Sequence, residues 1–129
     1  MANNPVRPEV AIAPKYNLMR GSATKQTPRI ELINPNTLSR LNSLEGHTDW
    51  INSIDYRSDG TQLISGSADK TVRLWDVATG QQLQVLPGHE YSIMGVAIFD
   101  KNEKAISADQ NGHFKYGVLR VDRSNASGD

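Results

Sequence analysis

The sequence predicts an all-β fold, because short runs of alternating apolar and polar residues are separated by turn residues along most of residues 16–121. A repeat supports this prediction: the pair Gly46-His47 recurs as Gly88-His89. Between the two pairs, and closer to the second, lies Trp75-Asp76. Self-similarity at such a fixed period indicates stacked copies of one supersecondary unit. The expected unit is a four-stranded antiparallel sheet.

Residues 44–87 contain one complete unit. Its four strands are expected over residues 50–56, 63–67, 71–76 and 82–86. Gly60 is expected to adopt a positive φ in the first turn, and Asp69-Lys70 to close a tight hairpin before the third strand.

The flanking segments keep only part of this pattern. Residues 16–43 are predicted to form a degenerate partial unit with strands over 29–32 and 40–44. Residues 18–23 weakly resemble the second strand of the complete unit. Residues 88–121 are predicted to form another, with strands over 91–99, 104–108 and 114–121. Residues 1–15, which hold three of the six prolines, are expected to be an extended or disordered arm, and residues 122–129 a disordered tail.

Residues 44–89 closely resemble a WD40 consensus repeat, since the two Gly-His pairs, Asp69 and Trp75-Asp76 stand at the spacing of that family. The resemblance implies blades of a β-propeller. At 129 residues the chain supplies about two to three blades, an incomplete propeller, whereas seven blades need roughly 300 residues. Three alternatives follow: the chain is a fragment of a longer propeller, several copies complete one propeller, or partners cap the arc.

The same resemblance implies a hydrogen-bonded tetrad of His47, Ser65, Asp69 and Trp75. Chemistry independently favours such a chain, because a buried carboxylate, imidazole, hydroxyl and indole can satisfy one another. The shift that takes His47 to His89 also gives a degenerate tetrad in the next unit, made of His89, Ser107 and Asn111, with Gly117 in place of the Trp.

A catalytic interpretation of the tetrad is weaker. Asp, His and Ser are the components of a nucleophilic triad. Here, however, Trp75 stands where a substrate would bind, and the spacing is that of a structural repeat. We therefore expect no catalytic residue and no enzyme activity.

Composition argues against several other classes of function. Fourteen basic residues balance fourteen acidic ones, so nothing favours nucleic acid as a partner. No apolar run reaches the roughly 20 residues of a membrane span, and the chain has no cysteine. Three dispersed histidines form no metal-ligand spacing, and no phosphate-binding loop precedes a helix. The expectation is a cytoplasmic protein without metal, cofactor or membrane insertion.

The resemblance implies a scaffold that binds proteins or peptides. The expected contact residues are Trp50, Asn52 and Ala68 in the complete unit, and Ser92, Met94 and Gln110 in the next. An alternative for Trp50 is packing against a neighbouring blade. Alternatives for the whole chain are a homo-oligomer, a structural accessory subunit docked by its strand edges and N-terminal arm, and a piece of a larger WD40-containing regulatory protein.

Overall fold

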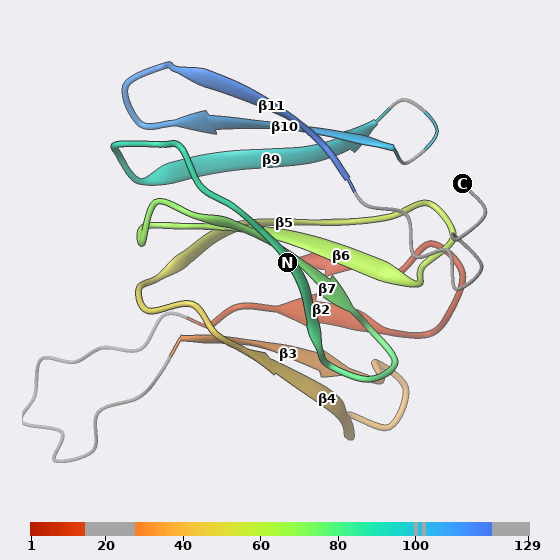
Figure 1. Cartoon of the computed structure of the whole chain (residues 1–129). Helices are drawn as coiled ribbons and strands as arrows, with labels where there is room; N and C mark the ends of the chain where they lie inside the picture. Colours follow the sequence, from red (N-terminus) through yellow and green to blue (C-terminus); the bar gives the residue numbers. More distant parts are fainter. Residues whose placement is uncertain (15–27, 100, 102, 120–129) are drawn as a thin grey trace, which may run out of the picture.

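The structure is a computed structural model that describes residues 1–14, 28–99, 101 and 103–119. Within these residues every regular element is a strand, and the strands form three antiparallel sheets stacked on one another (Figure 1). The strand orders are β1-β2-β3-β4 in the first sheet, β5-β6-β7-β8 in the second and β11-β10-β9 in the third. The predicted all-β fold of antiparallel blades is confirmed.

The middle sheet consists of β5 (Ile51–Tyr56), β6 (Gln62–Ser67), β7 (Val72–Asp76) and β8 (Gln82–Leu86). These strands lie where the alternating pattern predicts them. Gly60 has the expected positive φ, 74°, in the turn between β5 and β6. All six residues of β6 are buried, because this strand lies between the first and the third sheet.

The third sheet consists of β9 (Ile93–Phe99), β10 (Lys104–Asp109) and β11 (Phe114–Val118). β9 packs on β5 and β6 and joins this sheet to the middle one. Gly112, with φ 84°, lies in the β10–β11 hairpin. The opposite face of the sheet carries exposed side chains, which are Ile106, Phe114, Tyr116 and Val118.

The first sheet corrects the expectation of an arm over residues 1–15. It contains β1 (Ala2–Asn3), β2 (Val10–Ile12), β3 (Arg29–Ile33) and β4 (Arg40–Glu45), so the described residues 1–14 supply its first two strands. In β2, Ala11 lies opposite Leu32 and is fully buried. The short apolar run of β2 is stable only because the edge of β3 accepts its backbone hydrogen bonds, a partner that local sequence does not reveal.

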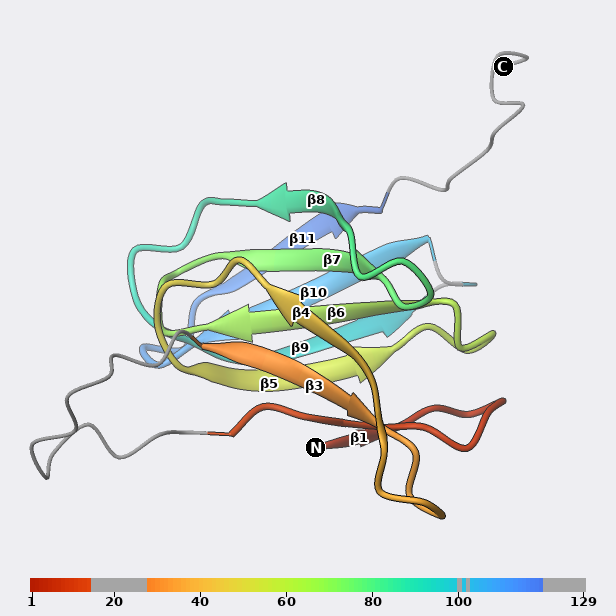
Figure 2. The same cartoon turned by 90° about the horizontal axis from the view of Figure 1, so that it is seen from below.

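Figure 2 shows β1 at the edge of the stack where β5 and β9 also lie, with β8 at the opposite edge. Because β2 is the neighbour of β3, the expected second strand at residues 18–23 is not needed to complete the first sheet. That segment, with the rest of residues 15–27, lies outside the described residues, as does the predicted tail at 122–129.

Buried polar residues attach the β1–β2 hairpin to the middle sheet. Asn4 Nδ2 donates a hydrogen bond to the Gly60 carbonyl oxygen at 3.0 Å, and the Tyr56 hydroxyl donates one to Glu9 Oε2 at 2.5 Å. Burial, followed by the hydrogen bond to Glu9, raises the pKa of Tyr56 far above its usual value. The phenol therefore stays protonated and remains a donor to the carboxylate.

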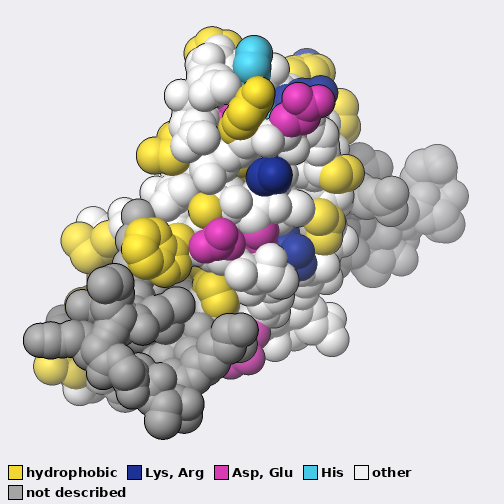
Figure 3. Space-filling view, turned by 90° about the vertical axis from the view of Figure 1, so that its left-hand side faces the viewer, with side chains coloured by type: hydrophobic (Ala, Val, Ile, Leu, Met, Phe, Trp, Pro, Cys, Tyr) yellow, Lys and Arg dark blue, Asp and Glu magenta, His cyan; other side chains and the backbone are white. Residues whose placement is uncertain are grey.

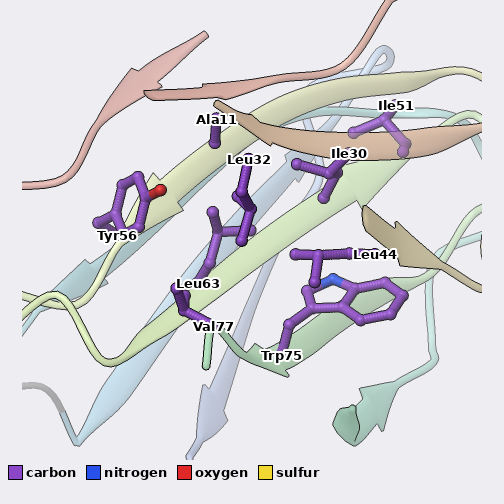
Figure 4. Packing of buried hydrophobic residues seen from close by; sticks show 9 residues of the cluster. All are labelled: Ala11, Ile30, Leu32, Leu44, Ile51, Tyr56, Leu63, Trp75 and Val77. Carbon is purple, nitrogen blue, oxygen red and sulfur yellow. The ribbon is translucent and has the colours of Figure 1, made fainter. Parts of the chain in front are cut away.

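Two hydrophobic clusters fill the spaces between the sheets. Between the first and second sheets the buried residues shown in Figure 4 are Ala11, Ile30, Leu32, Leu44, Ile51, Tyr56, Leu63, Trp75 and Val77. Between the second and third they are Ile64, Val72, Leu74, Ile93, Ala105 and Leu119. The first cluster contains an indole and the second contains no aromatic ring.

Substitution of Tyr56 by Phe tests the attachment of the hairpin. The change leaves the buried Glu9 carboxylate without its phenolic donor, so we expect the free energy of unfolding to fall by about 1–3 kcal/mol in urea titrations. Tyr116→Phe is the matched control, because Tyr116 is 58% exposed and should change the value by less than about 0.5 kcal/mol. Equal losses in the two variants would contradict the account.

Candidate functional site

The four residues of the expected tetrad come from four consecutive segments of the middle unit. His47 lies in the loop before β5, Ser65 on β6, Asp69 in the β6–β7 hairpin and Trp75 on β7. The structure brings them into one chain of contacts. His47 Nδ1 lies 2.7 Å from Asp69 Oδ2, His47 Nε2 lies 2.7 Å from Ser65 Oγ, and Trp75 Nε1 donates to Ser65 Oγ at 2.8 Å.

The indole fixes the direction of these hydrogen bonds. Trp75 Nε1 is a donor only, so Ser65 Oγ accepts from it and can donate its own proton to His47 Nε2. The neutral imidazole then carries its proton on Nδ1 and donates to Asp69. In this tautomer every polar group of the chain has a complementary partner.

Asp69 also accepts bonds from outside the tetrad. The Thr48 amide donates to Oδ2 at 3.0 Å, and the Thr71 amide and hydroxyl donate to Oδ1 at 2.9 and 2.6 Å. Burial alone raises the pKa of Asp69, but the hydrogen bonds from His47, Thr71 and Thr48 outweigh it and hold this pKa well below its usual value. The carboxylate is therefore ionised and ties the loop before β5 to the β6–β7 hairpin.

Burial decides what this chain of side chains can do chemically. Ser65 and Trp75 are fully buried and His47 is 4% exposed. The indole, packed beside Leu44 in Figure 4, occupies the side of Ser65 Oγ where a nucleophile would meet its substrate. The geometry favours a structural role over nucleophilic catalysis.

The third sheet contains a second histidine–serine–carboxylate chain, and it corrects the expected degenerate tetrad. His89 Nε2 lies 2.7 Å from Ser107 Oγ, as expected. The carboxylate beside His89 Nδ1 belongs to Asp109, at 3.3 Å, and Asn111 contributes only a backbone amide that donates to Asp109 Oδ1 at 2.9 Å. The third member is therefore Asp109, while Asn111 is exposed.

Comparison of the two repeats explains why the carboxylate in the third sheet comes from Asp109 and not from position 111. Asp109 is the counterpart, one repeat later, of Ser67, whose Oγ accepts from the Asp69 amide at 3.0 Å. Asp109 Oδ1 accepts from the amide of Asn111 in the same way, while Oδ2 reaches the histidine. One carboxylate thus replaces a serine and an aspartate. Ser107 and Asp109 are two residues apart on β10 and both contact His89, so the alternation of side chains from Ser107 was the signal that could have identified Asp109.

Asp109 has further donors in the β10–β11 hairpin. The His113 amide donates to Oδ1 at 3.0 Å, and His113 Nδ1 lies 3.2 Å from Oδ2. Burial raises the pKa of Asp109, but the bonds from the His113 and Asn111 amides and from His89 outweigh it and lower this pKa to about 2.

The expected contact residues lie at one end of the sheets, the end seen in Figure 3. They form two matching rows: Trp50, Asn52 and Ala68 at the middle sheet, and Ser92, Met94 and Gln110 at the third. The Ala68 amide donates to the Trp50 carbonyl oxygen at 2.7 Å, and the Gln110 amide donates to the Ser92 carbonyl oxygen at 2.9 Å. Asn52 connects the rows, since its Nδ2 donates to the Ile93 carbonyl oxygen at 3.0 Å and lies 3.7 Å from Met94 Sδ.

Two side chains of these rows are large, apolar and exposed. Trp50 is 45% exposed and Met94 is 53% exposed, and both lie outside the two buried clusters. Hydrophobic side chains at this end are scattered among polar and charged ones (Figure 3). This arrangement suits contacts with a partner through a few apolar anchors surrounded by polar groups.

In the described part of the chain, the His, Asp and Glu side chains include no group of three or more arranged to hold a metal ion. The same residues include no helix long and apolar enough to cross a lipid bilayer.

Comparison with known proteins gives a family match. Residues 38–76 match the family model "WD domain, G-beta repeat". The chain is 35% identical over 83 residues to the WD repeat-containing protein pop1 of Schizosaccharomyces pombe, covering 64% of this chain and 10% of that protein. It is 32% identical over 107 residues to the nuclear distribution protein PAC1 of Candida glabrata, covering 80% of this chain and 22% of that protein.

A third relative is the eukaryotic translation initiation factor 3 subunit I of Schizosaccharomyces pombe, 52% identical over 44 residues that cover 34% of this chain and 13% of that subunit. The chain therefore spans between about a tenth and a quarter of the length of these relatives.

The placement of the acid in the third sheet has a pH signature. Because the pKa of Asp109 is lowered from 3.8 to about 2 on folding, its ionised form stabilises the folded state above about pH 4. That stabilisation is lost as the pH falls through about 2. We expect Asp109→Asn to lower the melting temperature by several degrees at pH 7, with a difference from the unmodified chain that shrinks between pH 4 and pH 2.

Asn111→Ala is the matched control, because it keeps the backbone amide that Asp109 uses and should change the melting temperature little at any pH. A difference for Asp109→Asn that did not depend on pH, or a larger loss in Asn111→Ala, would contradict this assignment.

Proposed function

We propose that this chain, whose residues 38–76 form a WD40 repeat, is a non-catalytic scaffold that binds other proteins or peptides. The observation that carries the proposal is the pair of matching rows at one end of the sheets, with Trp50 and Met94 exposed beside polar groups. Trp is among the commonest anchors of protein interfaces, and Met adapts readily to different partners.

The buried Asp–His–Ser chains support the non-catalytic part of the proposal. Their hydrogen-bonding groups are directed at one another and at the backbone, and Ser65 has no solvent-accessible surface. A nucleophile in this position would need its indole partner to leave before a substrate could approach.

The name of one relative also supports a role in an assembly, since it is a subunit of eukaryotic translation initiation factor 3. We extend to this chain only the general idea of a scaffold with protein partners. A cytoplasmic location and the absence of nucleic acid partners stay predictions.

We further propose that another blade covers the open face of the third sheet. Phe114, Tyr116 and Val118 are each more than half exposed on β11, at the edge strand of this sheet. Exposed apolar residues on an unpaired strand favour association. The blade can come from a longer polypeptide, a second copy or another protein. A docking role for residues 1–14 is not proposed, because they already form strands of the first sheet.

Selection of peptides tests the scaffold function. A random peptide library displayed on phage should yield peptides that bind the chain, and their affinity should fall about tenfold or more in Trp50→Ala and Met94→Ala, because each loses an apolar anchor. Leu41→Ala is the matched control, since Leu41 is 48% exposed on β4, in the first sheet and away from both rows.

Calorimetry with the selected peptides would measure these affinities. Peptides that bound all three variants as well as the unmodified chain would contradict the proposed contact surface. Turnover of a generic ester or peptide substrate that was lost in folded Ser65→Ala would contradict the non-catalytic role.

A further inference from the structure

A cavity of about 220 Å³ lies between the second and third sheets. Six of the residues that line it carry the argument: Val72 and Leu86 from the second sheet, His89 from the loop before β9, and Ala105, Ser107 and Gly117 from the third sheet. Val72, Ala105 and Ser107 are buried and form its floor. At the rim, Lys115 is exposed, so the cavity is open to a ligand from solvent.

The walls of this cavity repeat the surroundings of Trp75, shifted along the chain by one repeat. The corresponding pairs are Ile30 and Val72, Leu44 and Leu86, His47 and His89, and Ser65 and Ser107. Gly117 is the counterpart of Trp75 itself, so the cavity lies where an indole lies in the middle unit. A second reduction in size, from Leu63 to Ala105, enlarges the space.

The space is accessible from the backbone of Gly117 without a clash. A Cβ atom added there would lie 3.4 and 3.7 Å from the two methyl groups of Leu86, which are ordinary van der Waals distances. The volume exceeds the roughly 150 Å³ of an apolar cavity that is known to bind benzene in another protein. A single aromatic ring system is therefore an appropriate size of ligand.

The polar group of the cavity selects a donor. Ser107 Oγ lies 2.7 Å from His89 Nε2, to which it can donate its proton as Ser65 does to His47. In the middle unit the same oxygen also accepts from an indole N–H, but among the described residues Ser107 Oγ has no second partner. A buried hydroxyl oxygen with an unused lone pair favours a ligand that carries one N–H.

A cation at the rim also follows the pattern of the middle unit. A Cβ atom added at Gly46 would lie 3.3 Å from Arg73 Nη1 and 3.1 Å from Trp75 Cη2, so Arg73 lies close to the indole. One repeat later, a Cβ atom added at Gly88 would lie 3.4 Å from Lys115 Nζ. Lys115 is therefore placed to approach a ring bound in the cavity, where a cation–π contact adds to binding.

We propose that the cavity is a binding site for an indole ring, a planar aromatic group with one N–H donor. The N–H would bond to Ser107 Oγ, and the ring would pack against Val72 and Leu86, which are neighbours on one face of the second sheet. This site goes beyond the scaffold function and does not depend on it, since it lies between the sheets and involves none of the expected contact residues.

Titration calorimetry of the full chain with indole and with N-methylindole tests the proposal. We expect saturable binding of indole, with N-methylindole bound about three- to tenfold more weakly because it cannot donate to Ser107. In Ser107→Ala the two ligands should bind equally. No saturable binding of indole, or equal binding of both ligands by the unmodified chain, would overturn the proposal.

Filling the cavity from within provides the control. Gly117→Trp should remove indole binding and raise the melting temperature, and Ala105→Leu, which fills the part occupied by Leu63 in the middle unit, is used if that variant does not fold. Persistent binding in a folded filled variant would overturn the proposal.

N-acetyltryptophanamide distinguishes two sources of the indole ring. Binding as tight as that of indole supports a site for a tryptophan of a peptide. Selective binding of free indole supports a site for a small molecule.

Discussion

The hydrogen bond from Trp75 Nε1 to Ser65 Oγ is the interaction on which the rest of this structure depends. It lets the largest side chain of the cluster between the first two sheets be fully buried without an unpaired N–H. It also sets the direction of the chain through His47 to Asp69, whose carboxylate holds the β6–β7 hairpin and the loop before β5 together. That loop and hairpin carry Trp50 and Ala68, so the interior network positions the exposed end of the middle sheet.

The third sheet shows what this architecture keeps when the indole is missing. The histidine and the serine stay in place, and a carboxylate reaches the histidine from Asp109. The anchoring of the hairpin therefore does not require the tryptophan, which explains how the β10–β11 turn keeps the geometry of the β6–β7 turn. The indole contributes a different property, the filling of the space between sheets, and Gly117 leaves that space open as a cavity. The hairpin can therefore stay anchored while the space between the sheets remains open for the proposed ligand.

The sequence predicts those parts of this fold that are decided locally. The strands of the middle unit and the positive φ of Gly60 follow from alternation and turn chemistry. The pairing of Val10–Ile12 with β3 could not be predicted, because it depends on a partner that is distant along the chain and the prolines nearby indicate an arm. A strict shift by one repeat selects Asn111, but the carboxylate that contacts His89 comes from Asp109, which lies on the same side of β10 as Ser107. The sequence shows Gly117 in place of the Trp, but whether the resulting space stays open depends on packing between two sheets, which a sequence pattern does not specify.

The central claim is that Asp69 and Trp75, which have no hydrogen bond to each other, are coupled through His47 and Ser65. A double-mutant cycle in urea with Asp69→Asn, Trp75→Phe and the combined variant measures this coupling directly. The account predicts a coupling energy of about 1 kcal/mol or more, because breaking the chain at one end removes much of what the other end contributes. Additive losses, with a coupling energy near zero, would mean that the four side chains act as separate contacts and would contradict the account.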